Sequence, residues 1–147
     1  MSTVYAESSA VLRWLLGTAD AESIEHALAG ARAVVTSELT SAEVGRSLRR
    51  LVTAGRIDGD AAERAWTSYA GAAAHWRLYV ISDTVLRRVR QPFPREPVRT
   101  LDAIHLATAS LYAVEVASPV VLSTDHALRS NAEALGLAVA PARPSPG

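Results

Sequence analysis

The chain has 147 residues, enough for one domain with its own core, and its lack of cysteine excludes disulfides, thiolate metal sites and thiol catalysis. Fifteen basic and fifteen acidic residues leave a net charge of zero, so no overall positive field points to a nucleic-acid partner. No apolar run approaches the ~18 residues of a membrane span and no signal peptide is evident, which fits a cytoplasmic protein.

Apolar strands alternate with helices along the chain. The expected strands are residues 4–6, 33–35, 78–81, 119–122 and 137–140, and the expected helices are residues 10–16, 20–30, 41–54, 58–74, 84–90, 101–112 and 126–135. Strands that are apolar on both faces need helices on both sides, so this alternation predicts an α/β fold with a parallel sheet. We expect residues 1–140 to form this single domain and the proline-rich residues 141–147 to be disordered.

Four acidic residues suggest chemistry. Asp102 lies in an otherwise apolar, alanine-rich helix, where an acid is unexpected unless its charge has a role. Glu7 comes directly after the first predicted strand, Glu43 lies shortly after the second, and Asp125 lies just after the fourth. Ligands of parallel sheets lie at the carboxyl ends of the strands, and Mg²⁺ and Mn²⁺ prefer oxygen ligands. The set therefore indicates a divalent-metal site.

Each acid also has a purely structural interpretation. The helix dipole favours Glu7 near a helix N-terminus whatever its function, and it could favour Asp102 in the same way. Glu43 could complete a capping box with Thr40, and Asp125 could cap the helix that follows it. Only the four acids taken together favour a metal site over four separate helix caps.

His105 lies three residues after Asp102 and shares its helix face. A carboxylate and a histidine at this spacing could bind a transition metal. No second histidine motif accompanies it, and a histidine among leucine, isoleucine and alanine more often satisfies a hydrogen bond in the core. We therefore do not expect His105 to be a ligand.

Five short motifs occur in an order that resembles the PIN domain, specifically the ribonuclease toxins of VapBC-type toxin–antitoxin pairs. Leu-Asp-Ala-Ile-His-Leu-Ala-Thr-Ala at residues 101–109 is the most specific of them. The others are Tyr-Ala-Glu-Ser-Ser-Ala at 5–10, Ser-Glu-Leu-Thr-Ser-Ala-Glu-Val at 37–44, Ser-Thr-Asp at 123–125 and Ala-Leu-Gly-Leu-Ala-Val at 134–139. One departure is Glu7, since the family usually has Asp there.

The resemblance implies a PIN-like three-layer αβα sandwich around a mostly parallel five-stranded sheet. It also implies a metal-dependent endoribonuclease in which a metal-activated water attacks a phosphodiester. The catalytic, metal-binding carboxylates would be Glu7, Glu43, Asp102 and Asp125, holding Mg²⁺ or, in its place, Mn²⁺. Glu7 is one methylene longer than the usual Asp, which changes the geometry that this site can offer to Mg²⁺.

The resemblance extends to supporting residues and partners. Ser9 and Ser123 match positions where the family has small hydroxyls near the site, and Arg46, just past Glu43, is the first choice for contact with RNA. Family members are generally homodimers that a small cognate antitoxin holds inactive. The expected partners are therefore RNA, an antitoxin and a second copy, with no membrane. Apolar contact with an antitoxin could come from Trp14, Leu15 and Leu16 or from the aromatic residues of the stretch 66–76, but a core position is favoured for each aromatic residue.

Three alternatives remain to be weighed. A non-catalytic PIN-like module could bind RNA or protein with a metal site that Glu7 weakens. A phosphoacceptor signalling domain would need a lysine opposite its acceptor, and this chain has no lysine. A small-molecule α/β enzyme would need a nucleophile motif or a glycine-rich phosphate loop, and the sequence contains neither.

Overall fold

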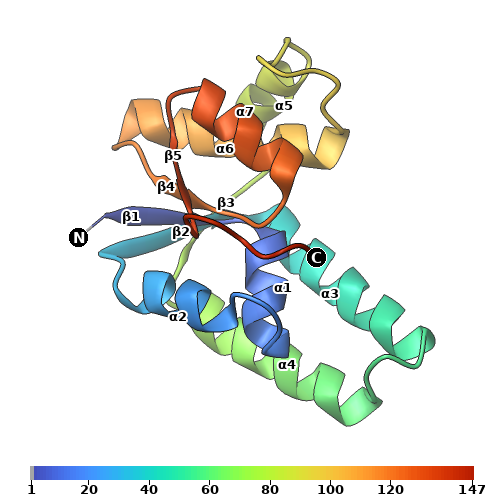
Figure 1. Ribbon diagram of the computed structural model, residues 1–147. Coiled ribbons are helices and arrows are strands. Elements are labelled where there is room, and N and C mark those ends of the chain that lie inside the picture. Colours follow the sequence, from blue (N-terminus) through green and yellow to red (C-terminus); the bar gives the residue numbers. More distant parts are fainter. Residues whose placement is uncertain (1) are drawn as a thin grey trace.

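A computed structural model describes residues 2–147, and at its centre five strands form one sheet (Figure 1). The strands are β1 (Thr3–Ala6), β2 (Ala33–Ser37), β3 (Arg77–Tyr79), β4 (Val120–Leu122) and β5 (Ala138–Ala140). Their order across the sheet is β3-β2-β1-β4-β5, and every neighbouring pair is parallel. The predicted parallel sheet is therefore confirmed.

Helices cover both faces of the sheet, which gives the three layers of an αβα sandwich (Figure 1). One layer consists of α1 (Ser8–Leu16), α2 (Ala21–Ala29), α3 (Glu38–Thr53) and α4 (Gly59–Ala73). The other consists of α5 (Asp83–Val89), α6 (Thr100–Glu115) and α7 (His126–Ala134). None of these helices, within residues 2–147, has the length and apolar character that crossing a membrane would require.

The core lies on both sides of the sheet because successive strand residues point to opposite faces. In β1, Tyr5 packs with residues of α6 and α7, whereas Ala6 packs with residues of α1, α3 and α4. Val34 and Val35 of β2 divide in the same way between the two clusters. The apolar character of both strand faces, visible in the sequence, is thus used by a helical layer on each side.

The strand order reverses direction at β1. From β1 the chain moves outward through β2 to β3, then returns to β4 on the other side of β1 and continues to β5. In sheets of this kind the crevice at the carboxyl ends of the two strands flanking the reversal is where ligands bind. Ala6 lies opposite Leu122 in the pairing of β1 with β4, and each is the last residue of its strand. The residues that follow, Glu7 and Ser123, therefore leave the sheet at this crevice.

The capping-box interpretation of Glu43 is wrong. α3 begins at Glu38 rather than at residue 41, and its N-cap is Ser37, whose hydroxyl accepts a backbone N–H at 3.1 Å. Thr40 lies inside the helix, and its hydroxyl pairs with that of Thr36 at 2.8 Å. Several hydroxyl residues near a helix start compete to cap it, and the local sequence does not decide among them. Glu43 is left in the second turn of α3, where no cap uses its carboxylate.

Residues 141–147 form neither helix nor strand, and they lie partly against the turn between α1 and α2. The backbone N–H and the hydroxyl of Ser145 donate to the two Asp20 oxygens at 2.7 and 3.1 Å. Arg13 Nη1 donates to the same carboxylate at 2.6 Å. Asp20 therefore precedes α2 without capping it through its side chain. The disorder expected for residues 141–147 stays a prediction.

Candidate active site

Four elements bring acidic residues to the carboxyl end of the central strands. Glu7 follows β1 and is the N-cap of α1, and Asp125 follows β4 and is the N-cap of α7. Glu43 comes from α3, and Asp102 from the first turn of α6. The N-cap role expected for Asp125 is confirmed, since its Oδ1 accepts the Leu128 N–H at 2.9 Å.

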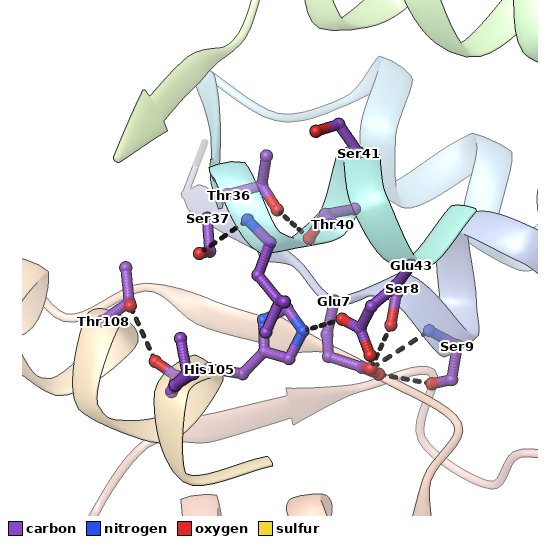
Figure 2. A network of polar contacts seen from close by, with 12 residues as sticks. Glu7, Ser8, Ser9, Thr36, Ser37, Thr40, Ser41, Glu43, His105 and Thr108 are labelled. Carbon is purple, nitrogen blue, oxygen red and sulfur yellow. Dashed lines mark hydrogen bonds and ion pairs between the residues drawn. The ribbon is translucent and has the colours of Figure 1, made fainter. Parts of the chain in front are cut away.

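Glu7 is only 3% exposed, and protein donors surround its carboxylate (Figure 2). Oε1 accepts the Ser8 hydroxyl at 2.8 Å and the Ser9 N–H at 3.1 Å. Oε2 accepts the Ser123 hydroxyl at 2.7 Å and also the Ser9 hydroxyl. An ionised carboxylate has about four lone-pair sites, and here four donors use them. We call Glu7, Ser8, Ser9 and Ser123 together the Glu7 corner.

The Glu7 corner links α1 to the segment after β4. The hydroxyls of Ser9 and Ser123 are 3.2 Å apart, and the Thr124 N–H donates to Ser9 Oγ at 2.9 Å. The Asp125 N–H donates to Ser123 Oγ at 3.1 Å. The structure therefore brings both predicted supporting serines to Glu7, where they hold its carboxylate and fix the path of the chain toward Asp125.

Glu43 is positioned from α6 by His105, as Figure 2 shows. His105 Nε2 lies 2.6 Å from Glu43 Oε1, and His105 Nδ1 lies 2.8 Å from the hydroxyl of Tyr5 in β1. His105 is 1% exposed, and both of its ring nitrogens have partners, the buried Tyr5 and the partly exposed Glu43. The expectation that this histidine satisfies hydrogen bonds in the core is confirmed.

Two opposing effects act on the pKa of His105. Burial lowers it, because a charged imidazolium is poorly solvated in the core. The hydrogen bond to Glu43 and the negative charges of nearby carboxylates, Glu7 first, raise it, and the net pKa lies above the ordinary value. The neighbourhood therefore favours a cationic ring that donates to Glu43.

Asp102 and Asp125 form what we call the acidic rim. The pKa of Asp102 is raised to about 6, first by burial, then by the negative charge of Asp125 and then by that of Glu7. Among residues 2–147 no side-chain or backbone donor forms a hydrogen bond with the Asp102 carboxylate. A carboxylate held near other acids without donors of its own is one that a cation would stabilise.

The donor set suits a divalent ion in part. No group of three or more ligating side chains within residues 2–147 is already arranged around a common point. The Asp102 carboxylate and one oxygen each of Glu43 and Asp125 carry no hydrogen bond, and oxygen donors of this kind suit Mg²⁺ or Mn²⁺. The negative charges of Asp125, Glu7 and Glu43 add to the effect of burial in raising the pKa of Asp102, and a cation would relieve this repulsion. Glu7 would need to release a serine hydroxyl before binding an ion.

Residues that the sequence analysis did not single out for the site also contribute. Tyr5 holds the far side of His105, and its position one residue before the end of β1 was the signal available. Arg46 lies beside Glu43 in a cavity of about 330 Å³ that Arg50 also lines. Arg50 lies seven residues after Glu43, which places it on the same helix face two turns away.

The aromatic residues of α4 and its surroundings mostly belong to the core. Tyr69 is 2% exposed, and its ring lies 6.0 Å from that of Trp76 and 5.4 Å from that of Trp66. Trp14 of α1 approaches Trp76 at 6.4 Å. The core interpretation is therefore confirmed for Tyr69, whereas Trp66 stays 39% exposed.

Residues 4–134 match the profile of the PIN domain. The chain belongs to the PIN domain family. It is 32% identical over 139 residues to Ribonuclease VapC46 of Mycobacterium tuberculosis, a match that covers 95% of this chain and 97% of that protein. It is 28% identical over 138 residues to Ribonuclease VapC35 of the same organism, covering 92% and 94%. The predicted resemblance to VapC-type proteins is confirmed.

Solved structures share the fold. A toxin–antitoxin complex from Klebsiella pneumoniae matches with a TM-score of 0.64 at 15% identity, covering 94% of this chain and 96% of the matched chain. A protein from Pyrobaculum aerophilum matches with a TM-score of 0.63 at 17% identity, covering 94% and 83%. The PIN-like sandwich predicted from the sequence is therefore confirmed, with a wholly parallel sheet.

Proposed function

We propose that this chain is a metal-dependent endoribonuclease and the toxin of a toxin–antitoxin pair. The observation that carries the proposal is the convergence of Glu7, Glu43, Asp102 and Asp125 at the reversal of the sheet, where burial and then the charges of the other three acids raise the pKa of Asp102 to about 6. Relatives named as VapC ribonucleases support the same activity, since they cover nearly the whole chain.

The free carboxylate oxygens of Asp102, Asp125 and Glu43 would hold Mg²⁺, or Mn²⁺ in its place, with Glu7 as a fourth ligand if a serine hydroxyl turns away. When bound, such an ion would lower the pKa of an attacking water and neutralise charge on the scissile phosphate. Without it, four carboxylates would repel an anionic substrate.

The remaining residues orient this centre. His105 binds one oxygen of Glu43, which leaves the other oxygen available to an ion. Ser9 and Ser123 hold Glu7, and Ser123 also anchors the backbone that positions Asp125. Arg46 would offset the negative charge of the site for an approaching RNA phosphate, so binding would be local and sensitive to salt.

Metal-dependent cleavage of RNA tests the proposal. Purified protein, freed of any antitoxin, is incubated with total bacterial RNA in Mg²⁺, in Mn²⁺ and in EDTA. We expect discrete products with either metal, none in EDTA, and a loss of about 10²-fold or more in rate for Asp102→Asn. Asp83→Asn is the matched control, because Asp83 is also an acid in the first turn of a helix but is 81% exposed and bound only to Arg87.

A non-catalytic module is the second candidate function, and the geometry of Glu7 is the observation that favours it. All four lone-pair sites of Glu7 are used by protein donors, so the site could be locked without a full set of ligands. Intact RNA in both metals, from a folded protein, would support this candidate. Glu7→Asp would then show whether the longer side chain silences the site.

We further propose an antitoxin partner and a homodimer. A fold neighbour solved as a toxin–antitoxin complex supports the first of these. If the proposal is right, co-expression with a small neighbouring gene product should yield a stable complex with no RNA cleavage. Light scattering of the isolated chain tests the dimer.

A further inference from the structure

Next to the acidic site a small cavity opens between α3 and the start of α6. Its volume is about 330 Å³, and its lining includes Leu39, Ala42, Glu43, Arg46, Arg50 and Leu101. This volume lies at the low end of the ~300–1,000 Å³ that ligand pockets have. The cavity is therefore large enough for one small group, and it shares Glu43 with the proposed catalytic centre.

The cavity carries positive charge along one face of α3. Glu43, Arg46 and Arg50 recur at positions i, i+3 and i+7, so they follow one another along the helix at ~5.4 Å per turn. Arg50 Nη2 donates to the hydroxyl of Ser47 at 3.0 Å. Within the described residues, neither Arg46 nor Arg50 forms an ion pair with an acid. Both guanidinium groups are therefore available for phosphate, which arginine binds through paired N–H donors.

The cavity also has apolar lining residues. Leu101 of α6, directly before Asp102, is 48% exposed, and Leu39 and Ala42 of α3 line the same cavity. An exposed leucine between carboxylates and arginines gains nothing from water. Its aliphatic side chain offers an apolar surface for the face of a nucleobase, which is the least polar part of an otherwise charged strand.

We propose that this cavity binds the nucleotide next to the scissile phosphate. The base lies against Leu101 and Leu39, and the phosphate of that nucleotide is bound by Arg46 and Arg50. A base can enter such a cavity only when it is unpaired and turned out of a helix. The substrate class is therefore single-stranded or looped RNA. This inference rests on the proposed function, since it uses the same site.

The two walls can be tested by binding alone, so that the outcome does not depend on cleavage. The protein carries Asp102→Asn and is titrated in EDTA into labelled RNA of mixed sequence, either single-stranded or annealed in a duplex. Fluorescence anisotropy measures binding over a range of salt concentrations. Leu101→Ser and Arg50→Gln are added singly. The controls are Leu86→Ser and Arg56→Gln, which change an exposed leucine and an exposed arginine outside the cavity.

We expect the single strand to bind more tightly than the duplex. Leu101→Ser and Arg50→Gln should each weaken single-strand binding about 5- to 10-fold, whereas the two controls change it by less than about 2-fold. Arg50→Gln should also reduce the slope of log affinity against log salt by about 1, because one phosphate contact is lost. Leu101→Ser should leave this slope unchanged, since it removes no charge.

Equal affinity for strand and duplex, or equal losses in the cavity and control variants, would overturn the proposal. Unchanged RNA affinity in both cavity variants would also overturn it, and would point to a protein segment as the occupant. If the binding results come out as expected but the unmodified protein cleaves no RNA with Mg²⁺ or Mn²⁺, the subsite stands and the nuclease function falls.

Discussion

The Glu7 corner and the acidic rim place carboxylates at the same crevice in opposite ways. Glu7 is buried and accepts four hydrogen bonds, so the fold itself stabilises its charge. Asp102 is half-buried, has other acids as neighbours, and its pKa is raised to about 6. The comparison teaches that one acid belongs to the folded framework, whereas the other is left for an external cation to stabilise.

The largest effect on stability is expected between these two regions, at His105. His105→Ala should lower the free energy of unfolding by about 3 kcal/mol, because it leaves a cavity and a buried Tyr5 hydroxyl without its partner. Urea denaturation measures this loss, with His75→Ala as a control at an exposed position. Similar losses in the two variants would mean that the buried contacts of His105 contribute little to stability.

The Glu7 corner should be weakened next. Ser123→Ala removes a buried donor to Glu7 at 2.7 Å and the acceptor of the Asp125 N–H, so we expect a loss of about 2 kcal/mol in the free energy of unfolding. Ser68→Ala, on the exposed face of α4, is the control and should change it by less than about 0.5 kcal/mol. A loss in Ser123→Ala no larger than in the control would show that the corner does not depend on its serines.

Removing the charge of Asp102 in the acidic rim should have the opposite effect and raise the free energy of unfolding. Because its folded-state pKa is about 6 and the unfolded value is ~3.9, Asp102 binds more protons in the folded state between these values, and stability falls as pH rises through this window. Above pH 6, in EDTA, Asp102→Asn should therefore raise the free energy of unfolding by about 1 kcal/mol, after allowance for solvent screening. Urea denaturation at pH 4.5 and pH 7 measures it; destabilisation at pH 7 would contradict this account.

The smallest effect on stability is expected for a surface ion pair. Asp83 and Arg87 are 3.3 Å apart on α5, at exposed positions four residues apart. Arg87→Ala should change the free energy of unfolding by less than about 0.5 kcal/mol, because water and salt screen such pairs. Urea denaturation measures this change, and a loss as large as that of Ser123→Ala would mean that burial does not distinguish the Glu7 corner from an exposed ion pair.

Much of the fold was predictable because its signals are local. The apolar strands, the helices between them and Gly136 after α7, with its φ of 84°, all follow from patterns within a few residues. The start of α3 was misplaced because Thr36, Ser37 and Thr40 all offer hydroxyls near it. Only packing against neighbouring elements selects one of them as the cap.

The candidate site, too, has features that the local sequence predicts and others that it does not. Glu7, Asp102 and Asp125 were identifiable from their places at strand and helix ends, and Glu43 from its position shortly after a strand. The contact of His105 with Tyr5 joins residues 100 positions apart, and that of Ser123 with Glu7 joins residues 116 apart. No local pattern encodes such contacts, so the difference between a stabilised Glu7 and an unsupported Asp102 appears only in three dimensions.

Metal-dependent stabilisation at two pH values tests the central claim most directly. Thermal unfolding is followed with Mn²⁺ and with EDTA at pH 5 and at pH 7.5, for the unmodified chain and for Asp102→Asn. If a cation relieves the charge of the acidic rim, Mn²⁺ should raise Tm clearly more at pH 7.5 than at pH 5, and this difference should vanish in Asp102→Asn. An equal shift at both pH values, or an undiminished shift in Asp102→Asn, would contradict the account.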